Sequence, residues 1–105
     1  NETLYGAIRY DSERRPMREV IRPTYFEGVG LVPGNLELME FEHETPRAIS
    51  ESRARGTDLF FRRVGTAIAE VSDDYDVVVI DCPPQLGYLT LGALTAATAM
   101  LITIH

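Results

Sequence analysis

Apolar residues in the chain recur at two different spacings, which predict helices and buried strands. The clearest helix is predicted by a stripe at helical spacing: Phe60, Val64, Ala67, Ile68 and Val71. Thr57 or Asp58 is expected to cap its start, and Ser72–Asp74 to close it. The next segment, Val77–Ile80, has four apolar residues without alternation. This predicts a strand buried on both faces, as in a parallel sheet.

Weaker patterns come before this pair of elements. A short helix is predicted over residues 2–10, and a short strand at Val29–Val32 after a polar loop. A second helix should start at Asn35 as its N-cap and end at Pro46, because proline breaks a helix interior. Residues 47–56 are rich in arginine and serine and predict a polar helix or a loop.

Three further elements follow Pro83–Pro84. Gln85–Gly87 predicts a loop, Leu89–Ala99 a helix without any charged residue, and Met100–Ile104 a second interior strand. We expect the uncharged helix to pack against the sheet and to lie beside a surface completed by further sequence or by a second protomer. The alternation of helix and strand predicts an α/β fold, with a partial doubly wound parallel sheet and helices on both faces.

The composition is that of an ordinary globular protein, and it narrows the possible partners. Apolar residues make up 45% and charged residues 25% of the 105 residues. The net charge of −6 and the pI near 4.8 argue against attraction of nucleic-acid phosphates by this segment. The single cysteine excludes an internal disulfide, and no apolar run approaches the roughly 18 residues of a membrane-spanning helix. No signal peptide is recognisable, so a reducing cytoplasm and no membrane partner are expected.

Asp81 is the strongest candidate for chemistry because it follows the predicted buried strand directly. Ligands of open α/β sheets bind at the carboxyl ends of the strands, and Pro83–Pro84 forces the chain out of the sheet just after the acid. Mg²⁺ keeps several waters and binds few carboxylates, so one aspartate here is suited to hold a hydrated metal. The structural alternative is an aspartate that caps the next turn.

A family resemblance is carried by the string DVVVIDCPPQLGYLTLGALTAATAMLITI. It resembles the Walker B strand, switch II loop and following helix and strand of the ParA/MinD ATPases, most closely the RepA-type plasmid-partition members. Thr3–Ile8 is similar to the helix after that family's second strand, and Val29–Asn35 to its "liPas" strand and turn. The resemblance implies a P-loop NTPase fold in which residues 1–105 are one segment of the ATPase domain, with Walker B and switch II at residues 75–92.

The resemblance also implies a function and partners. A member of this family is expected to use ATP and Mg²⁺, to dimerise on ATP binding, to contact DNA nonspecifically through parts outside this segment, and to act with a centromere-binding ParB/RepB-like protein. Such a protein is cytoplasmic and nucleoid-associated. The implied cofactor-binding residues are Asp81, Pro83, Pro84, Gln85 and Gly87, with Asp81 contacting the metal through water. Many relatives carry a small residue at the position of Gln85, which either orients an attacking water or faces solvent. Gly87 is expected to allow a positive φ before the helix.

The upstream motifs of this family have no counterpart in the chain. All ten basic residues are arginines, so no Gly-x-x-x-x-Gly-Lys-Ser/Thr phosphate loop is present. The family's catalytic aspartate and signature lysines also belong to upstream motifs, so no catalytic residue is assigned within the segment. Because the chain starts at Asn1 and ends within an apolar run at His105, it is expected to be an internal segment of a longer ATPase.

Other reactive side chains have simpler explanations. Cys82 is expected to be a buried packing residue, because no neighbouring His or basic residue would activate it. His43 and His105 form no recognisable metal or catalytic set. Arg62–Arg63 are expected to pair at the surface with Asp58 or Glu70. Four glutamates after Asn35 predict a solvated helix face rather than a metal cluster: Glu37, Glu40, Glu42 and Glu44.

Two other functions stay open at this point. A nucleotide-free interaction module derived from the same fold would have a similar sequence. A phospho-Asp receiver domain also places an aspartate at a strand end, but receivers use a lysine that this chain lacks, and Pro83–Pro84 suits them poorly. A lysine-bearing glycine-rich loop about a hundred residues before Asp81 would favour the ATPase.

We predict that the 105-residue segment alone neither binds ATP tightly nor hydrolyses it. A glycine-rich loop and its lysine supply most triphosphate contacts in P-loop proteins, and the segment has no lysine. Isothermal titration calorimetry with MgATP measures the affinity, and phosphate release measures turnover. Micromolar affinity or measurable turnover would contradict this prediction.

Overall fold

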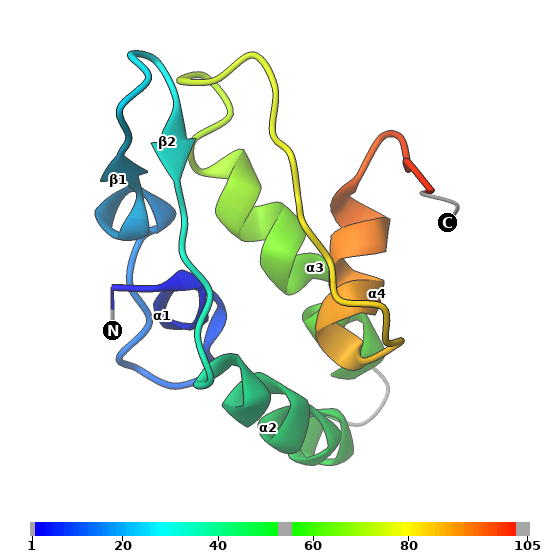
Figure 1. The fold of residues 1–105 in the computed structure, drawn as a ribbon. Helices are drawn as coiled ribbons and strands as arrows, with labels where there is room; N and C mark the ends of the chain where they lie inside the picture. The colour runs from blue at the N-terminus through cyan, green and yellow to red at the C-terminus, as the bar shows by residue number, and fades with distance from the viewer. Residues whose placement is uncertain (1, 53–55, 103–105) are drawn as a thin grey trace.

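The computed structural model describes residues 2–52 and 56–102, which form helices with one small sheet (Figure 1). The elements in chain order are α1 (Leu4–Ile8), the 3₁₀ helix η1 (Met17–Val20), β1 (Arg22–Pro23), β2 (Gly30–Leu31), α2 (Leu38–Ser52), α3 (Gly56–Ala69) and α4 (Tyr88–Ala96). No helix among these residues is both long and apolar enough to cross a membrane.

Helix α3 lies at the centre and contacts α1, α2 and α4, with α4 as its most extensive neighbour (Figure 1). The predicted amphipathic stripe is confirmed, because Phe60, Val64 and Ala67 are buried. Phe60 meets the ring of Tyr88 from α4 edge-on, with ring centroids 5.1 Å apart. The predicted start is wrong, since α3 begins at Gly56 and Thr57 and Asp58 lie within the helix.

The other side of α3 faces a core built by α1 and α2. Ile8 and Phe41 are fully buried there, and Tyr10 stacks on Phe41 with ring centroids 5.3 Å apart. The Tyr10 hydroxyl shares a hydrogen bond of 2.7 Å with the hydroxyl of Thr45, which also donates to the Phe41 carbonyl at 2.6 Å. The short helix predicted over residues 2–10 is therefore present as α1, and its apolar residues are core residues.

The prediction that Pro46 ends its helix is wrong, because α2 continues through it to Ser52. Proline removes one backbone hydrogen bond from a helix interior, but tertiary packing offsets such a loss. Phe41 and Thr45 before the proline are buried, and Ile49 after it packs against the core. Asn35 does act near the helix start: its side-chain oxygen accepts the Glu37 N–H at 3.0 Å, in a turn that precedes Leu38.

The predicted parallel sheet is absent from the described residues, where the only sheet is an antiparallel pair of two-residue strands. Arg22 pairs with Leu31, and Pro23 with Gly30. The strand predicted at Val29–Val32 is thus reduced to β2, next to Gly28 with its positive φ of 82°.

The run Val77–Ile80 follows α3 as expected, but it is neither a strand nor buried on both faces. Val77, Val78 and Val79 are 76%, 50% and 86% exposed. Met100–Ile102 is likewise exposed and unpaired, while residues 103 and 104 of that predicted strand lie outside the described residues. A strand in a parallel sheet needs neighbouring strands for its backbone hydrogen bonds, and none lies beside these two runs in the described part of the chain.

The predicted uncharged helix is α4, three residues shorter at its end than expected. Thr90, Gly92 and Ala93 are buried, while Leu94 is partly exposed at 38%. It packs against α3 rather than against a sheet.

Ion pairs and a hydrogen bond connect residues at and just before the start of η1 to the turn that follows α3. Glu70 accepts the Met17 N–H at 2.7 Å and pairs with Arg14, and Arg18 lies 2.7 Å from Asp74. Partial burial alone would raise the pKa of Glu70, but the Met17 N–H and Arg14 outweigh it, so the pKa lies below its usual value.

Replacing Phe41 by alanine should destabilise the chain by about 3–5 kcal/mol, because a fully buried ring leaves a cavity and Tyr10 loses its stacking partner. Denaturant unfolding measures the loss. Leu36→Ala is the control, since Leu36 is 84% exposed and its truncation should change stability by less than about 0.5 kcal/mol. Equal losses in the two variants would contradict this account of the core.

Glu70→Gln should lower the free energy of unfolding by about 1 kcal/mol at neutral pH, because the ion pair to Arg14 is lost. The pKa of Glu70 is lowered by folding, so its contribution is present above the unfolded pKa of about 4.3 and is lost as pH falls through the folded pKa. Unfolding of both proteins between neutral and acidic pH measures the difference, which should shrink in acid. Glu40→Gln, on the exposed face of α2, should show no such trend. A difference that persists in acid would rule out the ionised carboxylate as its source.

Candidate functional site

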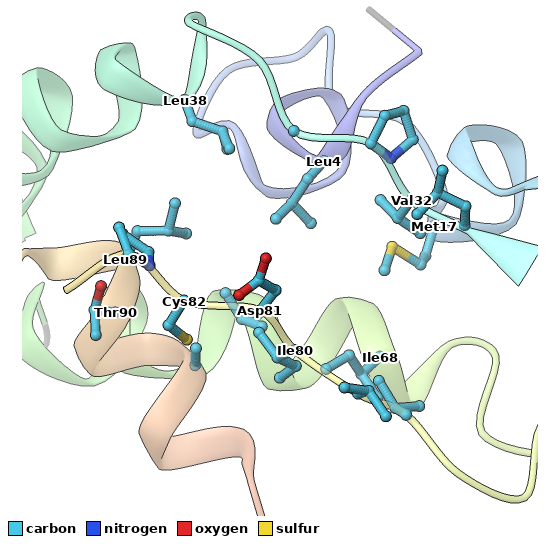
Figure 2. A pocket seen from close by; sticks show the side chains of 18 of the residues that line it. Leu4, Met17, Val32, Leu38, Ile68, Ile80, Asp81, Cys82, Leu89 and Thr90 are labelled. Atoms are coloured by element: carbon cyan, nitrogen blue, oxygen red, sulfur yellow. The ribbon is translucent and has the colours of Figure 1, made fainter. Parts of the chain in front are cut away.

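A cavity of about 710 Å³ separates two walls of the structure. One wall is β2, the turn Pro33–Gly34 and the start of α2, and the other is α3 with the extended segment Val77–Pro83. Figure 2 shows Leu4, Val32 and Leu38 on the first wall and Ile68 and Ile80 on the second. The lining is largely apolar, so the charged groups in it are few and specific.

Asp81 extends from the second wall into this cavity. Its carboxylate points towards Leu4 across the gap, while the sulfur of Cys82 lies on the other side of the backbone (Figure 2). Asp81 is exposed and makes no hydrogen bond or ion pair with another residue in the described ranges. The structural alternative, in which Asp81 caps the following turn, therefore has no support in this geometry.

The other predicted site residues lie on the chain that leaves Asp81. Pro83 and Gln85 line the same cavity, whereas Pro84 is exposed outside its lining. Gly87 occupies the N-cap position of α4. The prediction of a positive φ at Gly87 is wrong, because its φ is −109°.

Gly87 instead lies directly against the carboxylate of Glu42. A Cβ atom at this position would lie 2.6 Å from Oε1 of Glu42, closer than real Cβ contacts. Glu42 belongs to α2, and its carboxylate accepts the backbone N–H of Tyr88 at 2.9 Å and that of Leu89 at 2.9 Å. These are amides of the first turn of α4, which have no partner within the helix.

The role of Glu42 was not predicted, because the four glutamates after Asn35 were interpreted together as one solvated helix face. Glu42 caps α4, and Glu44 accepts the Tyr5 hydroxyl at 2.7 Å. Burial, together with this hydrogen bond to Glu44, raises the pKa of Tyr5 above its usual value. Glu40 is exposed, as predicted. The partners of Glu42 lie more than forty residues away in sequence, so no local pattern marks the contact.

Two further predictions about reactive residues are corrected by the structure. Cys82 is exposed rather than buried, because the segment that carries it has no covering layer among the described residues. Arg63 does not pair with Glu70: its guanidinium lies 4.3 Å from the centre of the Tyr10 ring and donates to the Arg9 carbonyl at 3.2 Å. Burial lowers the pKa of Arg63. His43 is exposed, and His105 lies outside the described residues.

The charge of the cavity restricts its ligands. Among the described residues, its lining contains two carboxylates, Glu42 and Asp81, and no cationic side chain. A triphosphate could not be held by these residues alone, because nothing in the lining offsets its charge. Glu42 is engaged by the amides of α4, so Asp81 is the carboxylate left for a cation. Residues 2–52 and 56–102 contain no group of three or more Asp, Glu, His or Cys side chains that could hold a metal ion. One exposed carboxylate suits a metal ion that keeps most of its waters.

Known proteins resemble the chain along its whole length. Residues 1–105 match the family model described as AAA domain. The chain is 62% identical over 105 residues to a putative replication protein A of Rhizobium rhizogenes. The matched region covers 100% of this chain and 26% of that protein. It is 33% identical over 103 residues to the chromosome partitioning protein ParA of Myxococcus xanthus (strain DK1622), or 98% of this chain and 32% of that protein.

A third relative is the chromosome-partitioning ATPase Soj of Treponema pallidum (strain Nichols), which is 32% identical over 102 residues, or 95% of this chain and 37% of that protein. The chain thus spans between about a quarter and somewhat over a third of the length of these relatives. No solved structure matches it.

Proposed function

The chain belongs to the AAA-domain family, within the ParA/MinD-type partition ATPases, and from this premise we propose that it is the Walker B and switch II part of an ATPase that segregates plasmid or chromosome DNA. The observation that supports the role most directly is Asp81. Its carboxylate is exposed, without a partner in the described residues, and points into the cavity at the end of an extended apolar segment (Figure 2).

The proposal includes a doubly wound sheet in the longer protein. Val77–Val79 and Met100–Ile102 are apolar and exposed, with backbone groups that no strand satisfies in the described residues. Such edges are costly to leave open, and pairing with further parallel strands would bury both faces. Asp81 would then stand at the carboxyl edge of the sheet, where ligands of α/β proteins bind.

In the proposed site Asp81 holds a water of hydrated Mg²⁺, and the bound metal would neutralise charge on the phosphates of ATP. The residues of this chain would position the reacting groups and would not themselves react. Pro83 and Pro84 turn the backbone away after the carboxylate, which leaves its oxygens accessible. Gln85 lines the same cavity and is proposed to contact the attacking water. Phosphate contacts would come from a glycine-rich loop with a lysine, which this chain does not contain.

The partners in this proposal follow from the family. The protein dimerises on binding ATP, contacts DNA nonspecifically through parts outside this segment, acts with a centromere-binding ParB/RepB-like protein, and is cytoplasmic and nucleoid-associated. The net charge of −6 would repel DNA phosphates. This supports a DNA contact through parts of the protein outside this segment. The partly exposed face of α4, which includes Leu94, is proposed to lie near the dimer interface.

We predict that Asp81→Ala in the full-length protein lowers Mg²⁺-dependent ATP hydrolysis by at least about a hundredfold, because the electrostatic stabilisation of phosphoryl transfer is lost. Folding should change little, since Asp81 makes no contact that supports the described core. Asp73→Ala is the matched control, because Asp73 is an exposed aspartate on the turn before the same segment.

Phosphate release at saturating MgATP and thermal unfolding of both variants measure the two effects. Equal turnover of Asp81→Ala and the unaltered protein, at matched thermal stability, would remove Asp81 from the site. Absence of hydrolysis and of ATP binding in the unaltered full-length protein would favour the nucleotide-free interaction module instead.

A further inference from the structure

One carboxylate joins α2 to the loop that carries the proposed switch residues. Glu42 accepts two backbone N–H groups in the first turn of α4, from Tyr88 and Leu89, each at 2.9 Å. The first amides of a helix have no partner within it, and a negative charge at this end is favoured by the helix dipole. The bonds are charge-assisted, which makes them stronger than bonds between neutral groups.

The same carboxylate fits closely around Gly87. A Cβ atom at residue 87 would lie 2.6 Å from Oε1 and 2.9 Å from Oε2 of Glu42. Gly87 has an ordinary negative φ of −109°, so a side chain at this position would not strain the backbone, but it would make the Glu42 carboxylate shift. Glu42 and Gly87 therefore form a matched pair across two elements.

We propose that Glu42 is a positioning residue for the loop Pro83–Gly87, and that it fixes where Gln85 lies relative to Asp81. The inference rests on the proposed ATPase function and deepens it. Glu42, Asp81 and Gln85 line the same cavity, so the carboxylate acts on the loop from inside the site.

The geometry explains why the loop needs such a contact. Pro83 to Leu86 are exposed, and proline supplies no backbone N–H for hydrogen bonding. The loop follows Asp81, whose side chain makes no hydrogen bond or ion pair within the described residues, and it ends at α4. Helix α4 packs on α3, where the ring of Tyr88 in its first turn meets Phe60, and Glu42 provides the acceptor for the backbone N–H groups of that turn. Loss of the carboxylate should free the loop without removing α4 from the core.

The test compares Glu42→Ala, Glu42→Gln and the unaltered protein, all in the full-length chain. Glu42→Ala should lower kcat for MgATP hydrolysis by about tenfold or more, because Gln85 is no longer held in place relative to Asp81. The KM for ATP should stay within about twofold, because the phosphate-binding contacts lie outside this loop. Glu42→Gln keeps one acceptor oxygen, so its kcat should be intermediate.

Hydrogen exchange without nucleotide reports the contact itself. Peptides that cover residues 83–92 should exchange faster by about tenfold in Glu42→Ala, because the amides of Tyr88 and Leu89 lose their acceptor. Glu40→Ala is the matched control on the same helix, since Glu40 is exposed, and it should leave both kcat and exchange unchanged.

A double-mutant cycle adds the role of Gly87. Gly87→Ala alone should free the loop as Glu42→Ala does, because the new methyl group displaces the carboxylate. In the Glu42→Ala background the same substitution should add little, because the atom that it meets has gone. Additive effects of the two changes on hydrogen exchange would overturn the pairing.

The outcomes separate this inference from the proposed function. Unchanged exchange of residues 83–92 in Glu42→Ala overturns the inference, whether or not the protein hydrolyses ATP. If a smaller folded fraction, measured by thermal unfolding, accounts for the whole fall in kcat of Glu42→Ala, the role of Glu42 is merely structural. This result would also overturn the inference. If the unaltered protein shows no ATP hydrolysis, the proposed function fails, and the exchange and double-mutant measurements still decide whether Glu42 fixes the loop.

Discussion

Burial of the apolar face of α3 is the interaction on which the rest of this structure depends. Phe60, Val64 and Ala67 on this one helix are shielded from water by α1, α2 and α4 together. The apolar stripe is wide enough to face more than one neighbour, so the helix packs against α4 on one side and against α1 and α2 on the other. Phe60 of α3 meets the Tyr88 ring of α4, and Tyr10 stacks on Phe41 in the part of the core next to α1 and α2.

The same packing places the candidate site. Because α2 and α4 both pack against α3, the Glu42 carboxylate of α2 comes within hydrogen-bonding distance of the first turn of α4. The loop that contains Gln85 therefore ends at a fixed point, while Asp81 at its other end faces a cavity with apolar walls (Figure 2). A single exposed carboxylate in apolar surroundings is suited to one contact with a hydrated cation, and the lining provides no cation for phosphate.

Two apolar runs of the chain form no strand within the described residues. Val77–Ile80 has the composition of an interior strand, and yet its valines face solvent. Helices satisfy their backbone groups internally, whereas a strand obtains its hydrogen bonds only from neighbours. In the described residues the helices therefore form, whereas Val77–Ile80 forms no strand.

The sequence by itself determined the elements whose signal is local, together with the family. The stripe on α3, the short apolar helix near the N-terminus and the motif around Asp81 could each be recognised from a few adjacent residues, and the family membership agrees with that motif. Tertiary structure alone decided the rest. The continuation of α2 through Pro46 depends on buried residues on both sides of the proline, which a local propensity does not include.

The roles of Glu42 and Gly87 likewise arise from residues more than forty positions apart, so composition and spacing gave no sign of them. Burial of Val77–Ile80 was predicted from its composition, but burial is a property of the neighbours that a strand acquires. A sequence records which side chains are suited to an interior, and the packing of the whole assembly decides which of them are covered.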